Sequence, residues 1–377
     1  METLGDGSFS LVSDYEHLLQ AYMDARKGKQ YRREVARFSE YADLYLLEIE
    51  ERLKDETYEF GPYRRLWVYI PKRRMVMALP FPDRVVQWSI YNLINPYFDR
   101  RMIEDSYACR EGKGSTAAAL RLQNWLRKAK RRPGRWYILK LDISKYFYRV
   151  DHAVLLEILG RHIKDAKLMR LLDRIINSTD EPFGLPRGMG PDDVTDDEWI
   201  FDVGMPIGNL TSQLFANIYL NELDQFVKHE LKINEFIRYM DDIIALAPDK
   251  ETARENWIQI ERFLKERLHL ELNRKTAIIP VEKGVEFVGI QITAQRMHLR
   301  KSTVGRMKRE TRFLTKEVLD GNISREKYQR HMTSIYGLTA HVDNKNLKAR
   351  LDAITAPAME GQTDGQMKDE TSQKAKE

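Results

Sequence analysis

The sequence has 377 residues, of which 42% are hydrophobic and 32% charged, which suits a globular chain with two or three packed subdomains rather than a disordered one. Cys109 is the only cysteine, so an internal disulfide is excluded and a reducing compartment is favoured. The formal net charge is only +5, but basic residues form clusters that could line a groove for a polyanion or simply cover solvated helix faces. The clusters lie at Arg64-Arg65, Lys72–Arg74, Arg127–Arg135 and Arg296–Arg309.

Signals for secretion and membrane insertion are not found. Residues 1–10 lack the basic segment and apolar core of a secretory signal, and no uninterrupted apolar run approaches membrane-spanning length. We therefore expect a cytoplasmic protein that has no membrane partner.

In the N-terminal third, apolar residues at helical spacing alternate with breaks marked by proline. Pro71, Pro80 and Pro82 punctuate one of these breaks, and Asp83 after them is a plausible helix N-cap. Helices are predicted over residues 15–24, 41–53, 83–98 and 115–130, and a strand over residues 66–70.

The rest of the chain mixes short apolar runs with helical patterns. Helices are predicted after Asp151, after Gly208, around residues 257–268 and over residues 302–351, where the pattern is also basic. Strands are predicted over residues 136–142, 277–280 and 285–292, a loop insertion over 182–203, and a disordered polar tail over 357–377. Because strands and helices interleave without regular βαβ spacing, the pattern favours an α+β fold.

The most informative segment is Arg238–Leu246, which is typical of a tight β-hairpin with Asp241 and Asp242 at its tip. Adjacent carboxylates repel each other and are costly to desolvate unless a cation neutralises them. Mg²⁺ is the natural partner, because it prefers hard oxygen ligands. The hairpin therefore predicts half of a metal site, which needs a third carboxylate from elsewhere.

Asp142 is the candidate third carboxylate. It ends the apolar run that begins at Trp136, where a charge is costly unless it is paired. A salt-bridged aspartate at a strand end would explain it alone. Together with the Asp241 hairpin, it suits two-metal phosphoryl transfer, in which carboxylates bridge two cations about 3.5–4 Å apart.

A third segment, Gly204–Gln213, lies directly before a predicted helix. Gly208 would let a base or sugar approach the backbone closely, and Ser212 and Gln213 would present polar groups from the first helical turn. A glycine loop followed by a helix cap is also common as a purely structural feature.

These three segments, in this order, resemble the palm of reverse transcriptases. Tyr107–Ser115, Asn273–Thr276 and Val285–Gly289 are similar to further blocks of that family, so the resemblance covers roughly residues 60–300. It implies a right-hand polymerase that adds dNTPs to a primer on an RNA template with two Mg²⁺ ions. The implied parts are an N-terminal helical extension (1–60), fingers (61–135), palm (136–300, with the insertion near 182–203), helical thumb (301–355) and disordered tail (356–377).

The resemblance also implies roles for single residues. Asp142 and Asp241 would ligate both metal ions with the Ile143 carbonyl, and Asp242 would be an accessory carboxylate. Phe147 falls at the position that blocks a ribose 2′-hydroxyl, although a core aromatic is the alternative. Arg74, which is adjacent to Lys72 and Arg73, would contact the triphosphate, and Lys275 could protonate pyrophosphate. Further implied nucleotide contacts are Ser144, Ile207, Gly208 and Gln213, and the implied primer grip is Phe287, Val288 and Gly289.

One departure from the family pattern narrows the resemblance. Most reverse transcriptases carry glutamine before this glycine and proline after the serine, where this chain has Ile207 and Gln213. That form is similar to the reverse transcriptases of diversity-generating retroelements. They copy a template-repeat RNA with errors at adenines, and they use a small basic accessory protein. An aliphatic Ile207 cannot offer the hydrogen bond of a glutamine amide, so weaker selection at the nascent pair is expected.

Other interpretations stay open at this point. A retron-like or phage-defence reverse transcriptase is the nearest alternative, and a non-catalytic RNA-binding scaffold is the alternative that the intact aspartates oppose. The insertion over residues 183–201 could lie near the nucleotide, contact the accessory protein or be a tolerated surface insertion. No RNase H, maturase or endonuclease domain is expected after the thumb-like segment.

Overall fold

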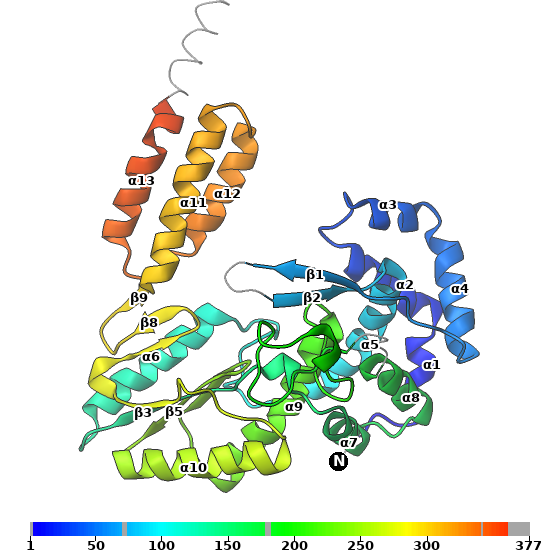
Figure 1. The fold of residues 1–377 in the computed structure, drawn as a ribbon, viewed down its shortest axis with the longest axis horizontal. Helices are drawn as coiled ribbons and strands as arrows, with labels where there is room; N and C mark the ends of the chain where they lie inside the picture. Colours follow the sequence, from blue (N-terminus) through cyan, green and yellow to red (C-terminus); the bar gives the residue numbers. More distant parts are fainter. Residues whose placement is uncertain (1–2, 70–73, 178–181, 341, 361–377) are drawn as a thin grey trace, which may run out of the picture. The chain divides into compact units, whose positions relative to one another are not determined.

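The computed structural model describes residues 3–69, 74–177, 182–340 and 342–360. They form two compact units, each of which is described by itself (Figure 1). The first consists of residues 1–114, 139–246 and 251–277, and the second of residues 115–138, 247–250 and 278–377. The two units cut across the five parts expected from the sequence, and that five-part division stays a prediction.

The first unit begins with short helices that pack around the long helix α5 (Phe81–Asp99). The predicted helices near residues 15–24, 41–53 and 83–98 are confirmed. Two others were not predicted, because neither is long enough to display a clear apolar period. The N-terminal helices are α1 (Ser8–Val12), α2 (Tyr15–Arg26), α3 (Arg33–Glu40) and α4 (Ala42–Lys54).

An antiparallel hairpin of β1 (Arg64–Val68) and β2 (Arg74–Ala78) precedes α5. The prediction of a strand over 66–70 was two residues late, and β2 was missed. In β2 the buried residues are Met75 and Met77, and methionine is a weak strand signal beside the flanking prolines.

The central four-stranded sheet has the order β4-β5-β3-β6. All four strands were predicted. Inner residues of β3 and β5, such as Leu139 and Ile244, are fully buried, whereas the residues of β6 are partly buried. The strands are β3 (Tyr137–Asp142), β4 (Phe236–Tyr239), β5 (Asp242–Ala247) and β6 (Ala277–Pro280).

Four helices complete the first unit. They are α7 (His152–His162), α8 (Ala166–Ile176), α9 (Leu210–Gln225) and α10 (Lys250–Arg267). Asp151 caps α7 as predicted, because its carboxylate accepts a hydrogen bond from the Val154 N–H. The structure adds α8, which the sequence reasoning missed. The stretch from 182 to 203 is irregular, as predicted, apart from one 3₁₀ turn over Asp196–Glu198.

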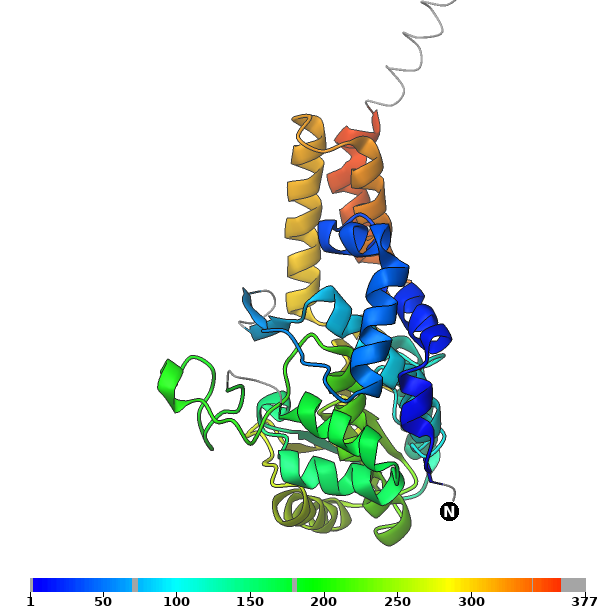
Figure 2. The same ribbon diagram turned by 90° about the vertical axis from the view of Figure 1, so that its right-hand side faces the viewer.

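The second unit contains α6 (Ser115–Arg131), a small sheet and a helical bundle. The sheet consists of β7 (Val285–Phe287), β8 (Ile290–Ile292) and β9 (Met297–Leu299), so the predicted run 285–292 is a hairpin. Both views show α11 (Lys301–Leu319), α12 (Arg325–Gly337) and α13 (Lys345–Glu360) side by side (Figures 1 and 2). Their shared core includes Met307, Tyr328 and Leu351.

The end of the chain corrects one expectation. A disordered tail from 356 or 357 was expected, but α13 continues through Pro357 to Glu360. Residues 361–377 lie outside the described residues. None of the described helices is both long and apolar enough to cross a membrane.

Candidate active site

Asp142 lies where β3 leaves the core. Ile138, Leu139 and Leu141 are fully buried, whereas the Asp142 side chain is only partly buried. The Asp142 carbonyl oxygen accepts a hydrogen bond from the Asn273 N–H at 2.7 Å. The Asp142 carboxylate therefore lies at the end of an apolar strand, and its backbone is fixed by the hydrogen bond from Asn273.

Asp241 lies in the two-residue turn between β4 and β5, which confirms the predicted hairpin. Tyr239 and Asp242 are paired across the two strands, so Met240 and Asp241 form the turn. Met240 has a φ of 53°, and a positive φ of this kind is what two-residue hairpin turns use.

Backbone hydrogen bonding brings the two sequence-distant aspartates onto neighbouring segments. Strand β5 lies next to β3 in the sheet, and the Ile143 N–H donates to the Asp241 carbonyl oxygen at 3.1 Å. Asp142 and Asp241 thus flank one backbone contact at the same end of adjacent strands.

Lys140 is a charged neighbour that the sequence reasoning did not assign. Its Nζ lies 3.8 Å from Asp242 Oδ1, and both side chains are mostly buried. Residues two apart on a strand share a face, so Lys140 and Asp142 lie on the same side of β3. That spacing was the sequence signal that could have revealed it. Lys140 offsets part of the negative charge of the aspartate group.

The donor chemistry of this site fits Mg²⁺, which uses one or two protein carboxylates and takes its remaining oxygens from substrate phosphates and water. Among the described residues, no group of three or more His, Cys, Asp or Glu side chains lies close enough together to hold a metal by itself. Two carboxylates and a backbone carbonyl are oxygen donors of the kind that Mg²⁺ uses, and its remaining ligands would come from substrate and water.

A buried ion pair between Arg238 and Asp224 anchors the β4–β5 hairpin to α9. Arg238, two residues before the turn, is fully buried, and its guanidinium donates to both carboxylate oxygens of Asp224 at 2.7–3.0 Å. Burial lowers the pKa of Arg238, but the Asp224 carboxylate outweighs it, so the pKa is raised overall. Arg238 also donates to Asn217 Oδ1 at 3.1 Å, which ties β4 to α9 at two points.

The expected sugar and base contacts lie on two segments joined by backbone bonds. Phe147, in a 3₁₀ turn after β3, is partly buried, and its carbonyl accepts from the Met205 N–H at 2.6 Å. Ile207 is also partly buried, and its carbonyl accepts from the Met77 N–H at 3.0 Å. Gly208 has a φ of 115°, and a Cβ there would lie 2.9 Å from Val76 Cγ1, so its glycine is required by the fold itself.

The remaining nucleotide residues are less closely defined. Gln213, in the first turn of α9, accepts a hydrogen bond from Cys109 Sγ at 3.4 Å, and Ser144 is held by its N–H to the Glu271 carbonyl. Lys275 is exposed in a turn. The backbone of Arg74 pairs with Val68, but its side chain, with Lys72 and Arg73, lies outside the described residues.

The expected primer-grip residues lie in the second unit. Val288 and Gly289 form the turn between β7 and β8, with φ values of 48° and 79°, and Phe287 is fully buried. The hairpin is therefore present, and its contact with a primer stays a prediction.

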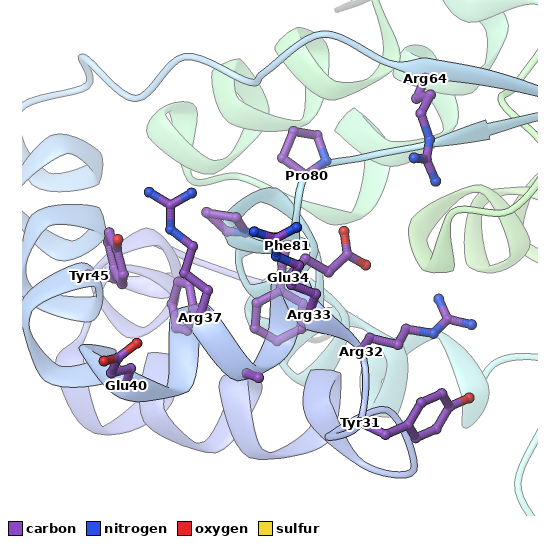
Figure 3. Close-up of a pocket in the computed structure, with 13 residues that line it drawn as sticks. Tyr31, Arg32, Arg33, Glu34, Arg37, Glu40, Tyr45, Arg64, Pro80 and Phe81 are labelled. Carbon is purple, nitrogen blue, oxygen red and sulfur yellow. The ribbon is translucent and has the colours of Figure 1, made fainter.

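A groove in the N-terminal part of the first unit is rich in arginine (Figure 3). Arg32, Arg37 and Arg64 surround it, beside the exposed ring of Tyr31. An adjoining smaller pocket shares Arg32 and Arg64 and reaches Gly208.

In the smaller pocket, cationic side chains lie close together. Burial lowers the pKa of Lys29, which lines the smaller pocket, and the charges of Arg84 and Arg32 lower it further against a smaller effect of Glu34. The groove itself is lined by Arg32, Arg33, Arg37 and Arg64 against Glu34 and Glu40, so basic side chains are in excess there.

An α+β fold whose sheet carries an acidic hairpin beside an aspartate at the end of a strand is the architecture of a polymerase palm. Residues 70–292 match the family model described as "Reverse transcriptase (RNA-dependent DNA polymerase)". The match spans more than half of the chain, which therefore belongs to the reverse transcriptase family.

Several curated proteins are similar to the chain. The protein YkfC of Escherichia coli is 30% identical over 218 residues, which are 55% of this chain and 52% of YkfC. The group II intron-encoded protein LtrA of Lactococcus lactis is 23% identical over 344 residues, 72% of this chain and 53% of LtrA. The chain thus spans about half the length of these relatives. The Candida tropicalis telomerase in complex with a fragment of telomeric RNA is a similar solved structure, with a TM-score of 0.46 and 14% identity, covering 79% of this chain and 55% of that chain.

Proposed function

We propose that this chain is an RNA-directed DNA polymerase, with Asp142 and Asp241 as its metal-binding carboxylates. The observation that carries this proposal is the Ile143–Asp241 backbone hydrogen bond, which sets the two aspartates at the same end of neighbouring strands. Membership of the reverse transcriptase family supports the same activity.

In this proposal the side chains divide the work of binding and orienting the substrates. Asp142, Asp241 and the Ile143 carbonyl would hold Mg²⁺, which would supply activation of the primer 3′-hydroxyl and charge neutralisation for the leaving pyrophosphate. Asp242 adds negative charge that Lys140 partly balances. Phe147 packs against the sugar, Arg74 and Lys275 contact the triphosphate, and Phe287 to Gly289 support the primer.

Asp142→Asn and Asp241→Asn test the activity. Each should lower kcat for dNTP incorporation by about 1000-fold or more, because several kcal/mol of charge stabilisation is lost and about 1.4 kcal/mol corresponds to tenfold. Primer extension on a defined RNA measures the effect, with Glu255→Gln on α10 as an exposed acidic control. Extension by either aspartate variant at the wild-type rate, with normal melting, would refute the proposal.

We further propose error-prone cDNA synthesis for a diversity-generating retroelement, with errors at template adenines. The support is the aliphatic Ile207 beside Gly208, together with Gln213 in the first turn of α9. A template-repeat RNA and a small basic accessory protein, itself oligomeric, are the partners that this assignment requires. The arginine-rich groove supports the RNA partner through its charge.

Ile207→Gln tests the mutagenic assignment. A glutamine amide restores a hydrogen-bonding group near the nascent pair, so misincorporation opposite adenine should fall several-fold while the melting temperature changes little. Sequencing cDNA made from a defined RNA measures the error spectrum, and Ile207→Val is the apolar control. Errors spread evenly over the four template bases in the wild type would refute this assignment and leave the polymerase activity intact.

A further inference from the structure

The two ends of the loop formed by residues 182–205 are joined by specific backbone contacts. A tolerated surface insertion does not need such contacts. The Gly184 N–H donates to the Ile200 carbonyl at 2.8 Å, and the Ile200 N–H donates back to Gly184 at 2.9 Å. A Cβ on Gly184 would lie 2.4 Å from Val203 Cγ2 and 2.7 Å from the Ile200 carbonyl oxygen. Only glycine fits where the two legs of this loop meet.

Both legs of the loop are hydrogen-bonded to the segment that carries Phe147. The Leu185 N–H donates to the Tyr148 carbonyl at 3.2 Å, and the Met205 N–H donates to the Phe147 carbonyl at 2.6 Å. The backbone around the expected sugar-contacting residue is therefore set by the loop.

The loop also contributes apolar side chains to a buried cluster. Phe183 and Trp199 are 2% and 8% exposed, although they belong to an irregular segment. The ring of Tyr148 stacks on Phe183 with centroids 4.8 Å apart and lies 6.0 Å from Trp199. Tyr148 directly follows Phe147, so this packing fixes the neighbour of the sugar-contacting ring.

The other side of the same cluster is formed by strand β2 and the segment before α9. Met75 and Met77 of β2 are buried in it, and Ile207 packs against it. The Met77 N–H donates to the Ile207 carbonyl at 3.0 Å. One cluster thus backs the three segments that carry Arg74, Phe147 and Ile207.

We propose that the loop of residues 182–205 is a positioning element of the nucleotide pocket, with Trp199 as its central positioning residue. Trp199 acts through the rings of Tyr148 and Phe183, which lie 6.0 and 6.3 Å from it, and does not itself touch the nucleotide. Because close-packed interiors respond to the loss of even small volumes, removing the indole lets these neighbours shift and loosens the pocket. This inference rests on the proposed polymerase function and deepens it by assigning part of nucleotide selection to the insertion.

The test is single-nucleotide incorporation by Trp199→Ala at varied dNTP concentrations on a defined RNA and primer. The KM for the correct dNTP should rise about tenfold, within the roughly hundredfold that a 1 Å misplacement can cost. The kcat at saturation should change by less than about twofold, the affinity for RNA should stay the same, and the frequency of wrong insertions should change. Trp199→Phe, which keeps a ring in the cluster, should restore most of the wild-type KM.

Phe201→Ala is the matched control, because Phe201 lies in the same loop but is 52% exposed. Its KM and error frequency should equal those of the wild type. If melting shows that Trp199→Ala does not fold, Trp199→Leu and Leu185→Val, which also remove volume from the cluster, are judged by the same KM and error criteria. A folded Trp199→Ala, or these two replacements where it does not fold, with wild-type KM and wild-type error frequency would overturn the inference alone. A wild-type protein that incorporates no dNTP would overturn the proposed function, and this inference with it.

Discussion

Phe147 is the side chain on which sugar selection should depend. It is partly buried in a 3₁₀ turn, and its backbone is fixed by the Met205 hydrogen bond, so its ring cannot easily move aside for a 2′-hydroxyl. Phe147→Ala should therefore admit ribonucleotides, with the dNTP to rNTP preference falling by about 10–200-fold, the range for one small group in a fitted pocket. Competing dNTP and rNTP incorporation measures the preference. Phe147→Tyr keeps the ring and should keep the preference for dNTP over rNTP. An unchanged preference in Phe147→Ala would show that the ring only packs in the core and does not select the sugar.

At the scale of elements, the ion pair between Arg238 and Asp224 joins the Asp241 hairpin to α9. Asp224→Asn leaves the Arg238 charge buried and uncompensated, so the free energy of unfolding should fall by about 3–5 kcal/mol. Urea unfolding at neutral pH measures the loss. The double variant Arg238→Met with Asp224→Leu removes both charges and should recover most of the stability.

Activity separates two roles of this ion pair. If the pair serves only stability, the double variant regains both stability and extension. If it also aims the hairpin, the double variant is stable but extends primers more slowly, because the bonds to Asn217 and the Met240 carbonyl are lost as well. A stable Asp224→Asn variant would contradict the importance given to this pair.

At the scale of the whole molecule, the arginine-rich groove should carry part of the affinity for RNA. Arg32→Glu with Arg37→Glu reverses two charges around it, so single-stranded RNA should bind more weakly. The slope of log affinity against log salt should decrease by about 0.7 for each lost phosphate contact. Fluorescence anisotropy over a range of salt concentrations measures both quantities.

The control for this prediction changes the same charge elsewhere. Arg254→Glu with Lys265→Glu on α10 alters exposed residues outside the groove and should leave the salt slope nearer that of the wild type. An equal loss of affinity in the two double variants would indicate general charge attraction and not binding in the groove.

The strands and the hairpin that carry the candidate site were largely predictable because their signals are local. An apolar run that ends in Asp142 predicts a strand with a rim carboxylate, and two aspartates between short apolar runs predict an acidic hairpin. Both are decided by periodicity and turn chemistry within about ten residues, and both strands and the hairpin are confirmed. Strand β2 and helices α1 and α3 were missed because they are short or, in β2, methionine-rich. Helix α8 was missed although its buried residues Leu168, Leu171, Leu172 and Ile175 recur at helical spacing.

The sequence by itself determined the α+β class, the acidic hairpin and the membership of a polymerase family, since each depends on motifs and their order. Only the tertiary structure decided what surrounds them. Lys140 beside Asp242, the Arg238–Asp224 pair and the packing of Trp199 against Tyr148 each join different segments of the chain. Such contacts depend on which strands become neighbours and which volumes are filled, and no local pattern in the sequence records either.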